Sequence, residues 1–203
     1  MKPFEYGMIH NYGALLFDLD GTLVDSMPAH NQAWIQVLKK YGVDISEDIL
    51  YKMAGIPNFR TAEIFIADYS IDVQPEQIVE QKEDLFVKSF KDLQKIPAVA
   101  AIAEKFYKIL PLGIVSGSSR ARIIESLEIT NLTHLFNCIV SSDDTERGKP
   151  FPEPYELAAR LLGVDSKTCL VFEDGAAGIE AALSAKMNVV YVKDGYLYDW
   201  SKK

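Results

Sequence analysis

Five short, continuously apolar runs are spaced along the chain, separated by polar or amphipathic segments. An apolar run without alternation is typical of a strand in a parallel sheet, which is buried on both faces. The runs cover residues 14–17, 112–115, 138–140, 169–172 and 189–192. Helix-like segments lie between the later runs, at residues 119–127, 154–162 and 176–185. This alternation of strand and helix predicts an α/β fold with a doubly wound parallel sheet.

Residues 27–96 interrupt this alternation. They contain four amphipathic segments and no convincing strand, and the segments cover residues 33–41, 46–53, 61–68 and 75–93. Turn-forming breaks separate the segments at Gly42, at Gly55-Ile56-Pro57 and at residues 72–75. We therefore predict a helical cap domain over residues 27–96, inserted after the first strand. Residues 1–26 and 97–203 would together form one α/β core.

Two aspartates, Asp18 and Asp20, follow the first apolar run, and Gly21 comes next in the chain. Carboxylates crowded at a strand end repel each other unless a cation lies between them, and hard oxygen ligands suit Mg²⁺. An ionised aspartate beside a metal can also attack phosphorus and form an aspartyl phosphate. The alternative is an acidic turn that ends the strand and caps a helix. These residues alone leave both interpretations open.

Polar residues also follow the next three runs. They are Ser116-Gly117-Ser118-Ser119, Ser141-Ser142-Asp143-Asp144 leading to Lys149-Pro150, and Glu173-Asp174-Gly175. Each group has an ordinary explanation, as a helix N-cap, a solvated loop or an acidic turn. However, open α/β sheets bind ligands beyond the carboxyl ends of their strands, and a helix N-terminus is a phosphate site. Polar groups after four strands of one sheet therefore favour a functional site at that edge.

The composition is that of an ordinary globular protein, with 203 residues, 48% hydrophobic and 25% charged. The formal net charge of −8 argues against a nucleic-acid partner, because dense Lys and Arg hold phosphate backbones. No segment has the length and hydrophobicity of a signal peptide or a membrane span, so we expect a cytoplasmic protein without a membrane partner. We also expect a monomer, with Cys138 and Cys169 as buried free thiols.

Four motifs occur in order along the chain. They are Asp18-x-Asp20-Gly21-Thr22, Ser116, Lys149-Pro150 and Glu173-Asp174-x-x-x-Gly178-Ile179. This order resembles the haloacid dehalogenase-like superfamily of phosphotransferases, over nearly the whole chain. The segment from Asp25-Ser26 through His30, Ala33 and Trp34, followed by the helical insertion, is similar to the β-phosphoglucomutase-like subfamily. That subfamily includes sugar-phosphate phosphatases as well as mutases, and its fold is a Rossmann-like core with a helical cap.

The resemblance implies a role for each matched core residue. Asp18 would be the nucleophile that takes the phosphoryl group. Asp20 would be the general acid/base, and its backbone carbonyl would also be a metal ligand. The implied phosphate site consists of Ser116, Gly117, Ser118 and Lys149. The implied Mg²⁺ site consists of Asp18, Asp20, Glu173 and Asp174.

The cap is expected to select the substrate, because the core residues would contact only phosphate and metal. Candidate substrate-binding residues are His30, Arg60 and Lys82 in the cap, together with Arg120 in the core. The alternative for the three cap residues is a solvated surface position. Asn58-Phe59 precedes Arg60, whereas mutases run Gly, a short apolar residue, Ser and Arg together. This departure favours a phosphatase, since a mutase must grip a second phosphate.

The sequence therefore predicts an Mg²⁺-dependent phosphatase that hydrolyses small phosphorylated metabolites, such as sugar phosphates, through an aspartyl phosphate. The alternative is a β-phosphoglucomutase, which interconverts β-glucose 1-phosphate and glucose 6-phosphate. In a mutase a sugar hydroxyl, rather than water, attacks the intermediate. A catalytically inactive binding protein would need damage in the catalytic set, and none is visible. Dehalogenation is disfavoured, because that chemistry does not call for Asp20.

Overall fold

The chain divides into two compact units. A computed structural model describes residues 2–53 and 56–200. The core unit contains the chain up to Asp25 and again from Gln94 onward. The helical unit contains the intervening residues, from Ser26 to Leu93.

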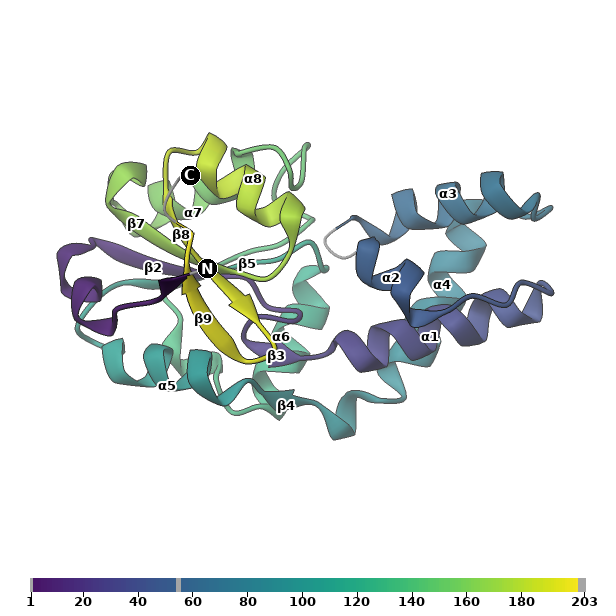
Figure 1. Cartoon of the computed structure of the whole chain (residues 1–203), viewed down its shortest axis with the longest axis horizontal. Helices are drawn as coiled ribbons and strands as arrows, with labels where there is room; N and C mark the ends of the chain where they lie inside the picture. Colours follow the sequence, from purple (N-terminus) through teal and green to yellow (C-terminus); the bar gives the residue numbers. More distant parts are fainter. Residues whose placement is uncertain (1, 54–55, 201–203) are drawn as a thin grey trace. The chain divides into compact units, whose positions relative to one another are not determined.

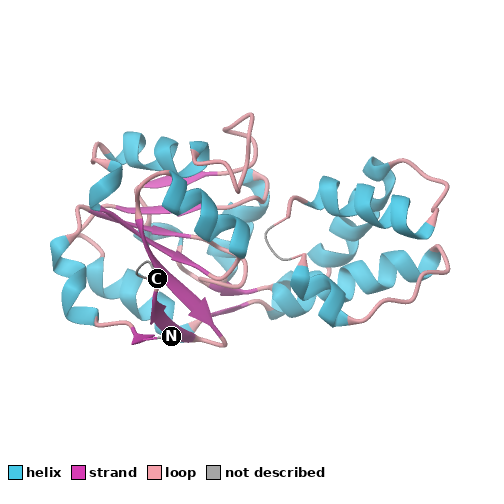
Figure 2. Ribbon diagram, turned by 45° about the horizontal axis from the view of Figure 1, so that its top comes forward, coloured by secondary structure: helices cyan, strands magenta, loops and turns pink. Residues whose placement is uncertain are grey.

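A seven-stranded sheet forms the centre of the core unit (Figures 1 and 2). Neighbouring strands run parallel in the spatial order β8, β7, β2, β5, β6. Their bounds are β2 (Ala14–Phe17), β5 (Leu112–Val115), β6 (Cys138–Val140), β7 (Cys169–Glu173) and β8 (Asn188–Lys193). Every residue of β2 and β5 is buried, which explains why their sequences are apolar without alternation. The predicted doubly wound parallel sheet is confirmed.

Antiparallel strands extend one edge of this sheet. β9 (Tyr196–Asp199) pairs with β8, and β1 (Lys2–Pro3) pairs with β9. A second, two-stranded sheet consists of β3 (Val24–Asp25) and β4 (Gln94–Lys95), also antiparallel. β4 corrects the expectation that residues 27–96 contain no strand. Two polar residues carry no hydrophobic pattern, so the local sequence could not reveal this pairing.

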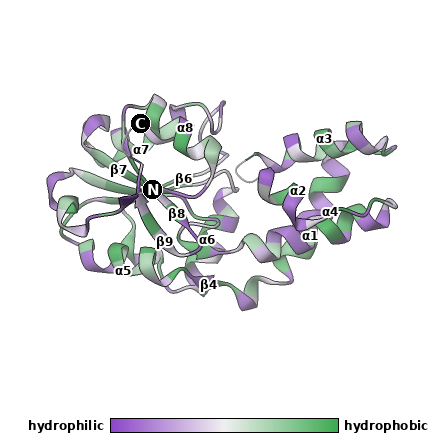
Figure 3. Ribbon diagram, viewed as in Figure 1, coloured by the Kyte–Doolittle hydropathy of each residue, from purple (hydrophilic) through white to green (hydrophobic). Residues whose placement is uncertain are grey.

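Helices cover both faces of the main sheet. α7 (Glu153–Leu162) and α8 (Ala176–Ser184) lie on one face, and α5 (Pro97–Phe106) and α6 (Arg120–Ile129) lie on the other (Figures 1 and 2). Hydrophobic residues concentrate on the strands and on the helix sides that face them (Figure 3). The apolar cluster under α7 and α8 includes Leu16, Val171 and Ala182. This packing holds the strand ends, and the polar residues that follow them, in fixed positions.

Short 3-10 helices connect several elements of the core unit. They are η1 (Tyr6–Asn11), η3 (Thr133–Leu135) and η4 (Ser166–Thr168). Across the described part of the chain, no helix combines the length and the apolar character needed to cross a membrane.

The helical unit has an apolar core of its own, which includes Trp34, Phe65 and Ile78. Its described helices are α1 (Met27–Lys40), α2 (Glu47–Lys52), α3 (Asn58–Tyr69), α4 (Pro75–Val87) and the 3-10 helix η2 (Phe90–Asp92). α4 packs against both α1 and α3. Helices therefore form at all four amphipathic segments of the sequence. Gly55, from one of the predicted breaks, lies outside the described residues.

Both cysteines are free thiols. Cys169 is buried as expected, but Cys138 is only partly buried, which corrects the prediction for that residue. The reason is that β6 is the last strand at its edge of the sheet, so one side of it has no neighbouring strand. Burial raises the pKa of both thiols to about 11, and both therefore remain protonated at neutral pH.

Candidate active site

The first acidic residue of the site leaves the sheet between two parallel strands. Phe17 of β2 pairs in register with Phe172 of β7 and with Ile114 of β5. The backbone N–H of the next residue, Asp18, donates to the carbonyl of Phe172 at 3.0 Å. Asp18 is buried, with 7% of its surface exposed. It therefore lies at the carboxyl end of the central strands, where open α/β sheets bind ligands.

Lys149 joins the carboxylate of Asp18, directly after β2, to that of Glu173, the last residue of β7. Its Nζ donates to Oδ1 of Asp18 and to Oε1 of Glu173, each at 2.6 Å. All three residues are buried. A buried lysine keeps its charge only when it is paired, so these contacts fix the loop between β6 and α7 against β2 and β7.

The carboxylate of Glu173 is held by several neighbours besides Lys149. Its Oε1 accepts a hydrogen bond from the hydroxyl of Tyr155 at 3.1 Å, and its Oε2 accepts one from the backbone N–H of Gly175 at 2.9 Å. Gly178, in the first turn of α8, leaves the room that this carboxylate occupies. A Cβ at that position would lie 1.6 Å from Oε1. Glu173 is therefore fixed in one orientation by polar contacts and by the shape of α8.

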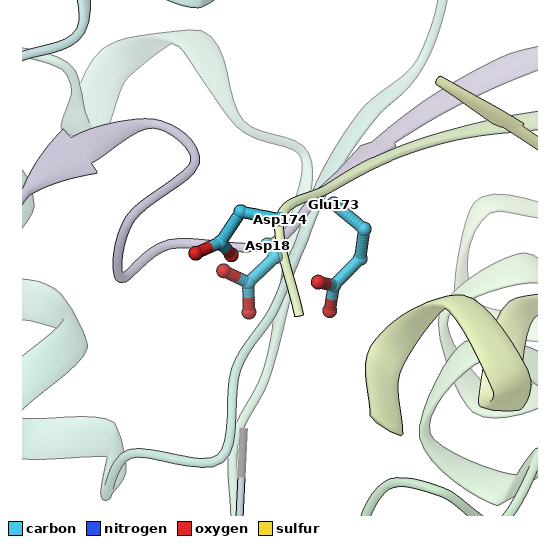
Figure 4. Close-up of side chains that lie close together, drawn as sticks. All are labelled: Asp18, Glu173 and Asp174. Atoms are coloured by element: carbon cyan, nitrogen blue, oxygen red, sulfur yellow. The ribbon is translucent and has the colours of Figure 1, made fainter. Parts of the chain in front are cut away.

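Asp174 completes a group of three carboxylates. Thr22, in the loop after β2, donates its hydroxyl to Oδ1 of Asp174 at 3.0 Å. Oxygens of Asp18, Glu173 and Asp174 all lie within 4.8 Å of one another, and Figure 4 shows the three side chains close together. The structure thus brings Asp18 together with Glu173 and Asp174, which lie 155 and 156 positions further along the sequence, at the ends of two adjacent strands.

This group fits a hard divalent cation such as Mg²⁺. All its donor atoms are carboxylate oxygens, which Mg²⁺ prefers. Burial, and then the charge of Glu173, raises the pKa of Asp174 to about 7. Burial also raises the pKa of Asp18 well above its usual value, and Lys149 opposes this shift. The negative charges are thus under-compensated in the protein alone, and a bound cation would supply what is missing.

Two neighbours of these carboxylates keep fixed protonation states. Burial disfavours the charge of Lys149, but the carboxylates of Asp18 and Glu173 outweigh it and raise the pKa of Lys149 well above its usual value. Burial, and then Glu173, also raises the pKa of Tyr155. Lys149 therefore remains a cation and Tyr155 remains a neutral hydrogen-bond donor at physiological pH.

Asp20 faces a different part of the site. Its Oδ2 accepts a hydrogen bond from Oγ of Ser118 at 2.9 Å and a longer one from Oγ of Ser116 at 3.4 Å. Gly21 follows with a φ of 85°, a left-handed conformation that lets the chain turn at once. The cluster of three carboxylates found in the described chain does not include Asp20. Its side chain instead adjoins the hydroxyl groups that the sequence assigns to phosphate binding.

Ser116, Gly117 and Ser118 form the loop between β5 and α6. The N–H of Ser116 still donates to Val140 of β6 at 3.0 Å, and the N–H of Ser118 donates to Oγ of Ser116 at 3.1 Å. A Cβ at Gly117 would meet open space. Hydroxyl groups and backbone amides next to a helix N-terminus are suited to bind phosphoryl oxygens.

Arg120, which the sequence suggested for substrate binding, pairs with residues of the core unit. One terminal guanidinium nitrogen lies 2.9 and 2.8 Å from the two carboxylate oxygens of Asp144. The same nitrogen donates to the carbonyl of Ile139 at 3.0 Å. These contacts favour a role in holding the loop after β6.

His30 and Lys82 lie together in the helical unit. Nζ of Lys82 is 2.7 Å from Nδ1 of His30 and donates to Oε1 of Glu83 at 2.8 Å. The ring of His30 stacks on Phe86, with centroids 3.8 Å apart. Lys82 is fully buried, so the alternative of an exposed lysine is wrong. Its partner His30 is 52 positions away, and no local pattern could have shown this pairing.

Arg60 is an exposed residue of α3. It donates to Oε2 of Glu63, one turn along the same helix, at 2.8 Å. Nearby Asn58 instead donates to Oε1 of Glu83 at 2.8 Å, the same oxygen that accepts from Lys82. The structure therefore brings Asn58, and not Arg60, into the network of His30 and Lys82.

Sequence reasoning assigned no role to Thr22 or Tyr155. Thr22 is the last residue of the first motif, and its place in that motif is the one sequence signal that could have indicated a role. Tyr155 lies within a predicted helix, where an aromatic residue is ordinarily core packing. Its hydrogen bond to Glu173 becomes visible only when α7 is placed on the sheet.

Comparison with known proteins places this arrangement in a family. Residues 15–192 match the haloacid dehalogenase-like hydrolase family. A fructose-1-phosphate phosphatase from Escherichia coli is 30% identical over 186 residues, covering 92% of this chain and 99% of the relative. A phosphorylated carbohydrates phosphatase from Thermotoga maritima is 29% identical, covering 88% and 83% respectively.

A solved structure shows the same fold. The crystal structure of a β-phosphoglucomutase from Clostridium difficile has a TM-score of 0.81 with 24% identity, covering 90% of this chain and 85% of the other. The family match extends from β2 into β8 and so includes every residue of the carboxylate cluster. The chain is an enzyme that belongs to the haloacid dehalogenase-like hydrolase family.

Proposed function

We propose that this protein is an Mg²⁺-dependent phosphatase that hydrolyses small sugar phosphates through an aspartyl phosphate on Asp18. One observation carries the proposal: Asp18 is buried 2.6 Å from the Lys149 ammonium and beside the carboxylates of Glu173 and Asp174. A carboxylate next to the Lys149 ammonium, and next to Mg²⁺ when the ion is bound, can approach a phosphate ester without prohibitive repulsion. The relatives named as phosphatases of fructose 1-phosphate and of phosphorylated carbohydrates support the substrate class.

In the first step, a carboxylate oxygen of Asp18 attacks phosphorus as the bond to the ester oxygen breaks. Asp20 donates a proton to that leaving oxygen. Lys149 and the hydroxyl of Ser116 neutralise charge on the non-bridging phosphoryl oxygens. The products of this step are the free alcohol and an aspartyl phosphate.

In the second step, Asp20 acts in the opposite direction. As a carboxylate it takes a proton from water, whose oxygen attacks phosphorus. The bond between phosphorus and Asp18 breaks, inorganic phosphate leaves, and both aspartates return to their starting states. The contacts of Asp20 with Ser116 and Ser118 support this role, because these are the serines that we propose to bind the phosphoryl oxygens.

Asp18 and Asp174 would hold Mg²⁺, together with the backbone carbonyl of Asp20 and with support from Glu173. When bound, the ion neutralises charge on the phosphoryl oxygens and on the carboxylates. The phosphate-binding residues of the core unit do not distinguish one ester from another. We assign substrate choice to the helical unit, where polar groups gather around the buried Lys82.

Two arginines that already pair with carboxylates of this chain favour hydrolysis over the mutase alternative. A mutase must bind a second phosphate, and Arg60 and Arg120 were the arginine candidates for that task. Each pairs with a carboxylate, Arg60 with Glu63 and Arg120 with Asp144. A neutral, hydroxyl-rich leaving group requires no such cation.

The test is a panel of phosphate esters assayed with Mg²⁺, in which free phosphate and isomerised sugar phosphate are measured separately. We expect the wild-type protein to release phosphate from sugar phosphates in the presence of Mg²⁺ and not to isomerise β-glucose 1-phosphate. The Asp18→Asn variant should release no phosphate. Isomerisation primed by a bisphosphate would favour the mutase. Full activity of Asp18→Asn would overturn the proposed nucleophile.

A further inference from the structure

Two loops that border the proposed phosphate site are tied together by side chains outside it. The first loop, after β5, carries Ser116 and Ser118. The second loop, after β6, leads to Lys149. Arg120 belongs to the first loop's helix, and Asp144 belongs to the second loop. Their ion pair spans 24 positions in the sequence and crosses between the two loops.

Asp144 is the centre of the second loop's turn. Its Oδ2 accepts hydrogen bonds from both the N–H and the Oγ of Ser141, at 2.7 and 2.6 Å. The same oxygen lies 2.8 Å from Arg120. Hydrogen bonds from Ser141, together with Arg120, lower the pKa of Asp144 despite its partial burial. The Asp144 carboxylate therefore stabilises the turn and also connects that turn to Arg120 of α6.

Two further bonds run between the loops in the same place. The backbone N–H of Arg120 donates to Oδ2 of Asp143 at 2.9 Å, and the N–H of Ser142 donates to the carbonyl of Ser118 at 3.1 Å. Ser118 in turn donates to Asp20. The loop carrying the phosphate-binding hydroxyls and the loop leading to Lys149 thus form one connected unit.

We propose that Arg120 and Asp144 are positioning residues, which hold Ser116 and Ser118 at the correct place relative to Lys149. This inference rests on the proposed phosphatase function and adds to it a pair of residues that do not touch substrate. Phosphoryl transfer depends mainly on the placement of charge-neutralising groups. A small displacement of one loop would therefore lower the rate of the chemical step more than it weakens substrate binding.

A direct contact of Arg120 with a substrate phosphate predicts a different result. In that case Arg120→Ala raises KM, and Asp144→Ala releases Arg120 to bind substrate better. The positioning role instead predicts a fall in kcat of about tenfold for each single variant, with KM nearly unchanged. The double variant should be no worse than either single variant, because both changes break the same link.

The experiment is a double-mutant cycle of Arg120→Ala and Asp144→Ala, with kcat and KM measured on the best sugar phosphate of the panel. Arg122→Ala is the matched control, because Arg122 lies on the same helix and pairs with Glu125, three residues further along that helix. We expect Arg122→Ala to retain wild-type kinetics. Arg120→Lys should recover part of the lost kcat, since a lysine can still pair with Asp144. A rise in KM without a fall in kcat, or additive losses in the double variant, would overturn the positioning role.

Amide exchange separates this inference from the proposed function. Hydrogen exchange at the N–H of Ser142 reports the bond to Ser118 without any turnover. It should accelerate in both single variants and stay at the wild-type rate in Arg122→Ala. If the wild-type protein hydrolyses no phosphate ester, the proposed function fails, and unchanged Ser142 exchange in Arg120→Ala would independently refute the link between the loops.

Discussion

A Cβ atom on Gly178 would lie 1.6 Å from Oε1 of Glu173, which is far inside van der Waals contact. The glycine thus creates the space in which the carboxylate meets Lys149 and Tyr155. In Gly178→Ala, either α8 or Glu173 must move, and we expect a stability loss of about 1–3 kcal/mol. Activity should fall by about 100-fold, because Glu173 and Lys149 shift together.

Thermal unfolding and phosphate release measure these two effects. Gly7→Ala is the control, since a Cβ there would meet open space. A Gly178→Ala protein with wild-type stability and activity would show that the position of Glu173 is unimportant.

Tyr155 should contribute to catalysis through a single hydroxyl. Tyr155→Phe keeps the ring in the core and removes the 3.1 Å hydrogen bond to Glu173. We expect the free energy of unfolding to fall by about 1 kcal/mol and the Mg²⁺ concentration for half-maximal activity to rise. Urea unfolding and a Mg²⁺ titration of activity test this, with Tyr107→Phe as a control outside the site. An unchanged Mg²⁺ titration would exclude Tyr155 from the metal site.

Mg²⁺ should stabilise the protein more as pH rises through about 7, the pKa of Asp174. Burial and Glu173 raise that pKa in the folded state, so the folded protein binds the proton more tightly than the unfolded chain. This contribution to stability is complete below the unfolded pKa of an aspartate and is lost as pH rises through about 7. Mg²⁺ competes with the same proton and therefore binds better once it has left.

The measurement is the melting temperature with and without Mg²⁺ at several pH values from 5 to 9. Asp174→Asn should remove both the effect of Mg²⁺ and its pH dependence. A Mg²⁺ shift of equal size at every pH would contradict the assignment of Asp174 as a ligand.

Asp20→Asn should separate the two chemical steps. With p-nitrophenyl phosphate the leaving group needs no proton, so the attack by Asp18 should still occur. Hydrolysis of the aspartyl phosphate needs a base and should become slow. Stopped-flow measurements should therefore show a burst of nitrophenolate, about one per enzyme, before a slow steady state. A linear time course at the wild-type rate would eliminate Asp20 as the general base.

The local sequence was sufficient to predict the five parallel strands of the main sheet. β2, β5 and β6 begin and end where their apolar runs do, because strands buried on both faces need apolar residues throughout. The helix α5 and the strands β3 and β9 were not predicted. β1 and β4 were not predicted either, since two exposed residues carry no such pattern. Their pairing depends on partners far away in the chain.

The site also contains residues that the local sequence could indicate and contacts that it could not. Asp18 and Asp174 could be singled out because they lie one and two residues past the ends of apolar runs, and the carboxyl ends of parallel strands meet at one edge of the sheet. The burial of Lys82 and the contact of Arg120 with Asp144 could not be predicted. Both depend on side chains that are distant in the sequence, and a lysine or arginine on an amphipathic helix ordinarily indicates a solvated surface.

The most direct test of the account is chemical trapping of the phosphoryl group on Asp18. The enzyme is quenched during turnover of a sugar phosphate with Mg²⁺ and reduced with borohydride, which converts an aspartyl phosphate to homoserine. Peptide mass spectrometry should then find homoserine at position 18 in the wild-type protein and none in Asp18→Asn. Homoserine at another aspartate, or its absence from position 18 while phosphate is being released, would contradict the proposed nucleophile.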